Sequence, residues 1–321
     1  MKAIVCTEYG IPEVLRLQHL DQPSPKPNEV LVKIHATTVT SADLRIRQAD
    51  PFPIRLFYGL IKPKSHTILG SELAGQIVAI GKQVTQFQVG DSVFAGTGTI
   101  LGANAEYICL PEDGAIALKP NNMTYTEAAA IPFGATTALF FLQDQAKIQP
   151  GQEILIYGAS GSVGIAAVQL AKFFGAQVTG VCSTAKLAMV KSLGADHLID
   201  YTQADFTHNP KTYDIIFDTS GKSNFRGCLR SLKPKGIYLR AVHFNPIMVL
   251  RGLWTSITST RKVMGGTAIE RKADLILLKE LIEDGKIKSV IDKCYPLDQA
   301  AQAHRYVELG QKQGSVVLTV N

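Results

Sequence analysis

The feature that most constrains the fold is a strand, a glycine-rich turn, a helix and a second strand that follow one another within residues 153–183. The apolar run Ile154–Tyr157 is typical of a buried parallel strand. From Val163 onward, apolar residues recur at helical spacing and give the helix one face to bury on a sheet. A second strand over Gln177–Cys182 completes a βαβ unit. This unit predicts a doubly wound domain.

The turn of this unit indicates a dinucleotide site. In the usual G-x-G-x-x-G register, alanine replaces the first glycine and an additional glycine precedes it, so the string by itself is a weak signal. The strand before it and the helix after it supply the required context. Backbone amides and the positive dipole end at the start of the helix suit a pyrophosphate. We expect a dinucleotide at Gly158, Ser160, Gly161, Ser162 and Val163, with a βα turn that holds no ligand as the alternative.

The end of the second strand favours NADPH over NADH. An NAD site normally carries Asp or Glu there to accept the ribose hydroxyls. Here Cys182 and Ser183 occupy that place, no acidic residue occurs between Glu153 and Asp196, and Lys186 follows. A hydroxyl with an ammonium group would bind a 2′-phosphate that a carboxylate would repel. We expect Ser183 and Lys186 to bind this phosphate; an exposed helix charge is the alternative for Lys186.

Length and composition describe an ordinary globular protein. A chain of 321 residues with 46% hydrophobic and 19% charged residues is long enough for two domains. No apolar run is long enough to span a bilayer, and the N-terminus lacks a secretory pattern, so we expect a cytoplasmic protein. The net charge of +6 is dispersed, without a basic stripe, and we expect no nucleic-acid partner. Five scattered cysteines without C-x-x-C argue against disulfides and structural zinc.

Residues 1 to about 120 are predicted to form a compact β-barrel-like domain, because short strands alternate with glycine and proline turns. The expected strands are Met1–Cys6, Glu29–Ala36, Leu73–Ile80, Asp91–Ala95 and Ala105–Leu110. A helix over Thr126–Gln143 is expected to link this part to the nucleotide domain.

The remaining residues are predicted to form a parallel sheet with intervening helices. The expected strands are Glu153–Tyr157, Gln177–Cys182, His197–Asp200, Asp214–Asp218, Gly236–Val242 and Lys262–Gly265. After them we expect helix Arg271–Asp284, strand Val290–Tyr295, helix Gln299–Leu309 and strand Gly314–Val320. This last segment is expected to return to the first domain.

Motifs spread over nearly the whole chain resemble the zinc-independent quinone oxidoreductase (zeta-crystallin-like) branch of the medium-chain dehydrogenase/reductase superfamily. In chain order they are Leu69–Gly75 followed by Gly81, Val89–Val93, Ala128–Pro132, Gly158–Gly164 and Leu193–Asp196. The resemblance implies a GroES-like substrate domain over 1–122 and 286–321 and a Rossmann NADPH domain over 123–285. It also implies an active site in the cleft between them and a homodimer joined through the Rossmann sheet edge.

The resemblance extends to the cofactor residues and fails at the metal ligands. The phosphate-binding serine, lysine and tyrosine of the branch match Ser183, Lys186 and Tyr201, although edge packing is the alternative for Tyr201. Zinc-dependent members of the superfamily carry histidine in a G-H-E motif, where this chain has Ser71. Their cysteine ligand is absent from 39–43. We therefore expect no metal and no oxidation of plain alcohols.

NADPH would supply a hydride to an electron-poor carbon, and quinones or α,β-unsaturated carbonyls accept it without a metal. The resulting oxygen anion needs a hydrogen-bond donor. Tyr58, in the aromatic segment 48–66 expected at the pocket edge, is our candidate, with packing as the alternative. Asp43 matches an aspartate of the branch, whereas Thr40 replaces an asparagine. Asp43 would orient a partner or cap the helix that follows.

Further residues are expected at the nicotinamide end of the cofactor. Thr136 and Thr137 follow a Pro-Phe-Gly turn, with helix-start capping as the alternative role. Ser220 (with Gly221) and Ala241 follow the fourth and fifth strands of the parallel sheet, and such sheets bind ligands at strand carboxyl ends. His243, just beyond, is interpreted as an ordinary loop histidine.

Two other functions remain open at the level of sequence. Arg55, Lys62 and Lys64 near the expected pocket would suit a phosphorylated carrier, which an enoyl-thioester reductase would meet. A cofactor-bound binding protein or redox sensor without turnover is the second alternative.

Overall fold

The structure is a computed structural model that describes residues 1–64, 67–208, 212–241 and 246–320, with the side chains of 246–249 and 253 excepted. The chain forms two compact units. The first contains Met1–Phe133 and Glu270–Asn321, and the second contains Gly134–Ile269. His243 and the end of the strand expected at Gly236–Val242 lie outside the described residues.

The limits of these units differ from the expected domain limits at both points where the chain passes from one unit to the other. Helix α3 (Tyr125–Ala129) packs on strands β3 (Glu29–Thr38) and β4 (Glu72–Ile80), so residues 123–133 group with the first unit. Helix α9 (Lys272–Glu283) packs on β7 (Ile116–Leu118), which brings residues 270–285 there too.

The first unit is built on a largely antiparallel sheet with the strand order β14-β15-β3-β4-β5-β7, and β6 also pairs with β3. A separate hairpin joins β1 and β2. The further bounds are β1 Lys2–Cys6, β2 Leu15–His19, β5 Ser92–Gly96, β6 Tyr107–Pro111, β14 Ile291–Pro296 and β15 Ser315–Thr319. Its other helices are α1 Ser41–Gln48, α2 Ile54–Tyr58 and α10 Ala300–Glu308, with short 3₁₀ turns at Pro12–Val14 and Leu297–Gln299.

Strand β15 pairs antiparallel with β3, which confirms that the end of the chain returns to the first unit. The core beneath this sheet combines side chains from both parts of the chain, including Val32, Leu73, Val93 and Val316. Burial of this shared core therefore ties the two parts of the chain together.

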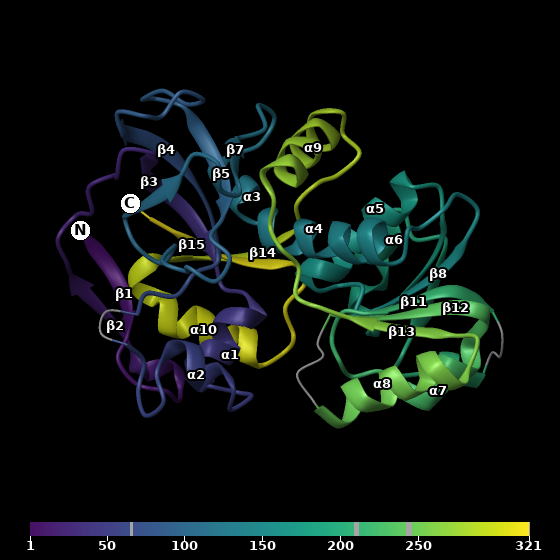
Figure 1. The fold of residues 1–321 in the computed structure, drawn as a ribbon. Helices are drawn as coiled ribbons and strands as arrows, with labels where there is room; N and C mark the ends of the chain where they lie inside the picture. Colours follow the sequence, from purple (N-terminus) through teal and green to yellow (C-terminus); the bar gives the residue numbers. More distant parts are fainter. Residues whose placement is uncertain (65–66, 209–211, 242–245, 321) are drawn as a thin grey trace. The chain divides into compact units, whose positions relative to one another are not determined.

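The second unit is a parallel sheet of six strands in the order β10-β9-β8-β11-β12-β13. Helices α5 and α6 cover one face, and α7 and α8 cover the other (Figure 1). The strands are β8 Glu153–Tyr157, β9 Gln177–Cys182, β10 His197–Asp200, β11 Tyr213–Asp218, β12 Leu232–Arg240 and β13 Lys262–Gly265. The helices are α4 Pro132–Leu139, α5 Ser162–Phe173, α6 Leu187–Ser192, α7 Phe225–Ser231 and α8 Pro246–Thr258, with short 3₁₀ turns at Thr184–Lys186 and Phe206–His208.

The chain reverses its direction of travel across this sheet between β8 and β11, which are neighbours. Such a reversal opens a crevice at the carboxyl ends of the two strands, where doubly wound sheets bind their ligands. The parallel sheet confirms the predicted Rossmann class. Among the described residues, no helix combines the length and apolarity needed to cross a bilayer.

One predicted element is wrong. The single helix expected over Thr126–Gln143 is three pieces: α3, α4 and a π-helical segment over Phe140–Gln145. Proline lacks the N–H that a continuous helix would need, and Pro132 instead begins α4, a position that proline favours.

Candidate active site

The turn after β8 has the shape expected for a phosphate-binding loop. Gly158 has a φ of +83°, which glycine adopts without the strain that a side chain would bring. Gly164 lies so close to the turn that a Cβ atom there would be 2.1 Å from the carbonyl oxygen of Gly158. These two glycines allow α5 to begin directly against the end of β8.

The start of α5 is open to a ligand. Gly161 is its N-cap residue, and no side chain caps the first turn there. A Cβ on Gly161 would meet only the Gly158 carbonyl oxygen, at 3.6 Å. Ser162 and Val163 are half-buried, whereas Ser160 is buried. Helix N-termini present amide donors and a positive dipole end, so the residues present fit the pyrophosphate of a dinucleotide.

The loop after β11 lies against this turn. A Cβ on Gly158 would be 2.7 Å from the hydroxyl of Thr219 and 3.3 Å from the Cβ of Ser220. At the end of the next strand, the amide of Ala241 donates to the carbonyl oxygen of Asp218 at 3.1 Å. The structure therefore brings the predicted residues Ser220 and Ala241 to the same sheet edge as the glycine turn.

Asp218, which the sequence analysis did not single out, shapes this loop. Its buried carboxylate accepts hydrogen bonds from the amides of Ser220, Gly221 and Ser223, at 2.8 to 3.1 Å. It also accepts one from the hydroxyl of Ser223 at 2.6 Å. The polar run that follows an apolar strand end was the available signal, because a buried carboxylate needs such donors.

The residues predicted to bind the 2′-phosphate lie at the ends of β9 and β10. Ser183 follows β9, and its carbonyl oxygen accepts from the amide of Lys186 at 2.9 Å in a short 3₁₀ turn. Tyr201 follows β10, and its amide donates to the carbonyl oxygen of Cys182 at 3.2 Å. The ring of Tyr201 is exposed and lies 6.4 Å from that of Tyr157. All three predicted side chains therefore stand at one corner of the carboxyl edge.

A carboxylate that the sequence analysis missed stands at this corner. Asp200 ends β10 and is paired in register with Cys182 of β9. It accepts hydrogen bonds from the hydroxyls of Thr184 and Thr202 and from the amide of Thr202, and these donors hold its pKa below the ordinary value. Asp200 lies on the third strand of the chain order rather than on the second, where an NAD site carries its acid, but the sheet places these two strands side by side.

The predicted residues Thr136 and Thr137 lie inside α4, four and five residues after its first residue. The alternative that they cap the start of a helix is therefore wrong. A Cβ on Gly134 would be 2.7 Å from the carbonyl oxygen of Ser162, so the first turn of α4 packs against the start of α5. Thr137 follows Gly134 by three residues and shares its side of the helix. This spacing places Thr137 on the helix side nearest the glycine turn.

Thr40 and Asp43, both in the first unit, form the capping box of α1. The carboxylate of Asp43 accepts from the Thr40 amide at 2.8 Å, the Thr40 hydroxyl at 2.6 Å and the Gly70 amide at 2.9 Å. Complete burial raises the pKa of Asp43, and these donors oppose that rise. The helix-capping role considered from sequence is confirmed.

Ser71, which stands where the resemblance to zinc-dependent dehydrogenases would place a histidine, lies beside the hydroxyl group of Thr40. The hydroxyl oxygens of Thr40 and Ser71 are 3.3 Å apart, and the nearby Asp43 carboxylate already accepts three hydrogen bonds. No thiolate or imidazole, the usual zinc ligands, lies among these contacts. Within the part of the chain that the structure describes, no three His, Cys, Asp or Glu residues come together to hold a metal ion. This donor set does not fit zinc.

Glu72 is a buried carboxyl group beside this cluster. It accepts from the hydroxyl of Thr38 and, at 2.7 Å, from the amide of Phe133. Burial raises the pKa of Glu72 to about 8, and the charges of Glu270 and Asp43 add to this rise. Glu270 itself accepts from the amide of Gly98 at 3.0 Å, and burial raises its pKa to about 7. These contacts agree with the structural role expected for Glu72.

A pH dependence of stability follows from Glu72. The folded chain binds the Glu72 proton more tightly than the unfolded chain. The stabilisation that comes from this proton is therefore complete below the ordinary pKa of 4.5 and is lost as the pH rises to about 8. The neutral Glu72→Gln variant lacks this loss. We therefore expect the free energy of unfolding of the variant, minus that of the wild type, to increase by roughly 3 kcal/mol from about pH 5 to pH 8. Urea denaturation of both proteins at each pH measures this difference. Parallel pH profiles for the two proteins would contradict this reading.

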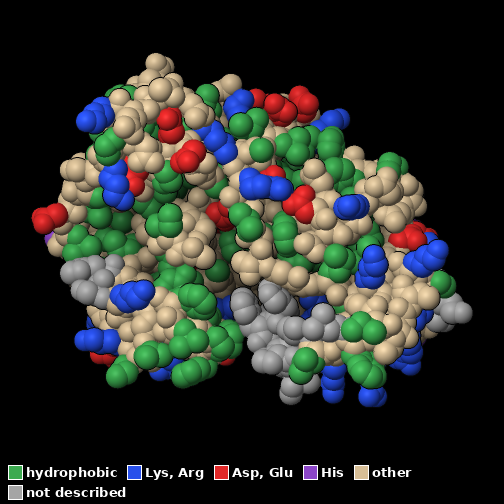
Figure 2. Space-filling view, in the orientation of Figure 1, with side chains coloured by type: hydrophobic (Ala, Val, Ile, Leu, Met, Phe, Trp, Pro, Cys, Tyr) green, Lys and Arg blue, Asp and Glu red, His purple; other side chains and the backbone are tan. Residues whose placement is uncertain are grey.

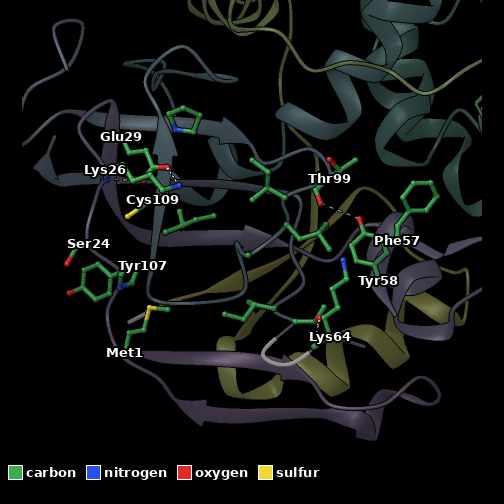
Figure 3. A pocket seen from close by; sticks show the side chains of 18 residues that line it. Met1, Ser24, Lys26, Glu29, Phe57, Tyr58, Lys64, Thr99, Tyr107 and Cys109 are labelled. Carbon is green, nitrogen blue, oxygen red and sulfur yellow. Dashed lines mark hydrogen bonds and ion pairs between the residues drawn. The ribbon is translucent and has the colours of Figure 1, made fainter. Parts of the chain in front are cut away.

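Tyr58 lies in the first unit, in the segment expected to edge a pocket. Phe57, Tyr58 and Lys64 line an open hollow of about 730 Å³, whereas Phe52 does not (Figure 3). The Tyr58 hydroxyl points toward the carbonyl oxygen of Thr99 at 3.4 Å, a long hydrogen bond. Burial, with the charge of Asp43, raises the pKa of Tyr58, so its phenol stays protonated and able to donate.

Comparison with known proteins places this geometry among oxidoreductases. The family described as "Alcohol dehydrogenase GroES-like domain" matches residues 26–120, and "Zinc-binding dehydrogenase" matches residues 193–318. A 2-methylene-furan-3-one reductase of Solanum lycopersicum is 33% identical over 99% of this chain and 79% of its own length. A quinone oxidoreductase of Sus scrofa is 31% identical over 95% of this chain and 93% of its own. The solved quinone oxidoreductase of Coxiella burnetii superposes with a TM-score of 0.90, at 27% identity, over 100% of this chain and 99% of its own.

Proposed function

Because the chain belongs to the quinone oxidoreductase branch of the medium-chain dehydrogenase/reductase superfamily, we propose that it reduces quinones or α,β-unsaturated carbonyls with NADPH and without a metal ion. The observation that carries this proposal is the carboxyl edge of the parallel sheet. There the glycine turn, the Ser183–Lys186 corner with Tyr201, and the loop ends at Ser220 and Ala241 follow one another along neighbouring strands.

Different residues of this edge would bind different parts of NADPH. The first turn of α5 would hold the pyrophosphate, and Ser183, Lys186 and Tyr201 would hold the 2′-phosphate of the adenosine end. Thr137, Ser220 and Ala241 would position the nicotinamide end. When bound, the reduced nicotinamide supplies a hydride to the substrate carbon. The protein must then stabilise the charge that develops on the substrate oxygen.

We assign that stabilisation to Tyr58, through a hydrogen bond from its phenol. Asp43 and Thr40 act as positioning residues, because they fix the start of α1 and the backbone at Gly70. A Lewis acid is not needed for an enone or a quinone, since the added charge delocalises onto oxygen. The hydroxyl groups at Thr40 and Ser71 support a reaction without zinc, although one matching family is described as zinc-binding.

The substrate class is tested by the rate of NADPH oxidation with a quinone, a free enone and the coenzyme A thioester of the matching enoyl acid. We expect the quinone or the free enone to be turned over faster than the thioester. A thioester that is preferred would indicate an enoyl-thioester reductase instead. Tight NADPH binding without turnover of any of the three would indicate a binding or sensing protein.

A further inference from the structure

The hollow that Tyr58 lines extends well beyond this residue. Its volume of about 730 Å³ lies within the range of pockets that bind small molecules. In Figure 3, Phe57 and Tyr58 stand at one end of the hollow, and Tyr107 and Cys109 of β6 stand at the other. The hollow therefore begins at the hydroxyl that donates to the substrate oxygen in the proposed reaction, and it leads away from that hydroxyl.

The wall between these two ends is largely apolar. Ile68, Leu101 and Ile108 line it, together with Ile100 and Phe57, which are 70% and 72% exposed. Large apolar side chains that remain in water around a concave surface are typical of a ligand groove. A ligand that covered them would gain the burial that the fold itself leaves unused.

The loop that carries Ile100 and Leu101 is strained. Leu101 has a φ of +60°, which a leucine rarely adopts. Gly102 has a φ of +101°, and a Cβ there would be 3.2 Å from Cδ1 of Ile108 on β6. This conformation buries Leu101 against the hollow and leaves Ile100 exposed beside it. Backbone strain that the surrounding structure imposes is typical of ligand sites.

The hollow is elongated. Tyr107 and Pro111, the first and last residues of β6, both line it, so it follows the whole strand. A strand of this length spans about 13 Å, close to the length of an extended chain of about ten carbons. Lys26 and Glu29 form an ion pair of 3.2 Å at the end away from Tyr58 (Figure 3). Because these two charges satisfy each other, that end requires no charged group on the ligand.

We propose that this hollow holds an unbranched alkyl chain of the substrate, so that the protein prefers α,β-unsaturated carbonyl compounds with a chain of about six to ten carbons over short ones. The proposal rests on the proposed function, because it places the substrate carbonyl oxygen at Tyr58. The chain would run from there past Leu101 and Ile108 toward Cys109. The homodimer implied by the resemblance would join through the second unit, whereas every residue that lines the hollow belongs to the first.

The test compares enones that share a reacting group and differ only in the length of a saturated chain. Pent-3-en-2-one and dec-3-en-2-one carry the chain on the β carbon, and pent-1-en-3-one and dec-1-en-3-one carry it on the carbonyl carbon. One buried methylene group raises kcat/KM about fourfold when burial is complete, and roughly twofold in a hollow that is open on one side. With NADPH, we expect kcat/KM of the long enone to exceed that of the short one by roughly 30-fold in at least one pair.

Two variants and two matched controls locate the chain. Cys109→Phe fills the hollow from β6, since strands accommodate aromatic side chains, and Ile100→Ser removes apolar surface beside it. We expect the ratio of kcat/KM, long enone over short, to fall below about fivefold in Cys109→Phe and by about threefold in Ile100→Ser. Cys294→Phe on β14 and Ile11→Ser change exposed residues of the same types elsewhere in the first unit, and they should keep the wild-type ratio.

A saturated ketone reports on the hollow without any reduction. Decan-2-one, titrated calorimetrically into the protein in the presence of NADP⁺, should bind roughly tenfold more weakly to Cys109→Phe than to the wild type. Cys294→Phe should bind it as the wild type does.

Three results would overturn the proposal. The first is equal kcat/KM for the long and short members of both pairs, and the second is a Cys109→Phe variant that binds decan-2-one as tightly as the wild type. The third is an Ile100→Ser variant whose mass in solution is halved, because a second copy would then cover the hollow. A protein that reduces none of the enones but loses decan-2-one binding in Cys109→Phe would contradict the proposed function while supporting a hollow that binds an alkyl chain.

Discussion

Replacing Gly164 with alanine is expected to destabilise the second unit by about 3 kcal/mol or more, a large fraction of the stability of an ordinary domain. The added Cβ would lie 2.1 Å from the carbonyl oxygen of Gly158 and 2.8 Å from the Cα of Ala159. Both are backbone atoms between β8 and α5, so no side-chain rotation relieves the clash. The helix must move away from the strand, and the packing beneath α5 is lost with it. Urea denaturation without NADPH measures the loss of unfolding free energy, and denaturation with NADPH measures whether the displaced helix still binds the cofactor.

Gly161→Ala is the matched control, because it changes a glycine of the same turn in open space. Gly161 has a φ of −85°, and its Cβ would meet only one atom, at 3.6 Å. We expect a change in unfolding free energy below about 1 kcal/mol. NADPH affinity should still fall, because the methyl group would cover backbone that faces the pyrophosphate. Equal stability losses in the two variants would show that the close approach at Gly164 does not set the fold of the turn.

Lys186→Ala is expected to weaken NADPH binding by roughly 30-fold or more while changing NADH affinity less than about threefold. A charged hydrogen bond to a phosphate contributes about 1.5 to 3 kcal/mol, and NADH has no phosphate at this position. Calorimetric titration of both nucleotides into both proteins gives the four affinities. Equal losses for NADPH and NADH would place the 2′-phosphate elsewhere.

Two further variants sharpen the interpretation of this corner. Lys191→Ala removes an exposed lysine on α6 that bonds the backbone at Asp196, and it should leave the preference for NADPH unchanged. Asp200→Asn removes the carboxylate at the end of β10, and it should strengthen NADPH binding relative to NADH binding. A preference for NADPH that drops in Asp200→Asn would mean that this carboxylate organises the phosphate site through Thr184 and Thr202.

The strands of the parallel sheet were predictable because each is a short apolar run bounded by glycine or polar turns. β8, β9, β10 and β13 have the expected bounds. The short strands β2 and β7 were missed, since a run of only three to five residues gives little periodicity. Pro132 broke an expected helix whose apolar pattern alone looked continuous.

Some residues of the candidate site were also predictable from the sequence, and others were not. The glycine turn was predictable from the local sequence, because each glycine is needed by the conformation or close packing of the backbone at its own position. Asp218 and Asp200 did not follow, since their importance depends on which strands are neighbours in the sheet. The role of Glu72 as a buried, proton-binding group also required three-dimensional contacts with Thr38, Phe133 and Glu270.

The most direct test of the account follows a deuterium label. The protein is treated with a chelator and then given an enone and NADPH with both hydrogens at nicotinamide C4 replaced by deuterium, and the product is analysed by mass spectrometry and NMR. We predict one deuterium on the carbon β to the carbonyl, at a rate that the chelator leaves unchanged. An unlabelled product, or turnover that stops with the chelator and returns with zinc, would contradict the account.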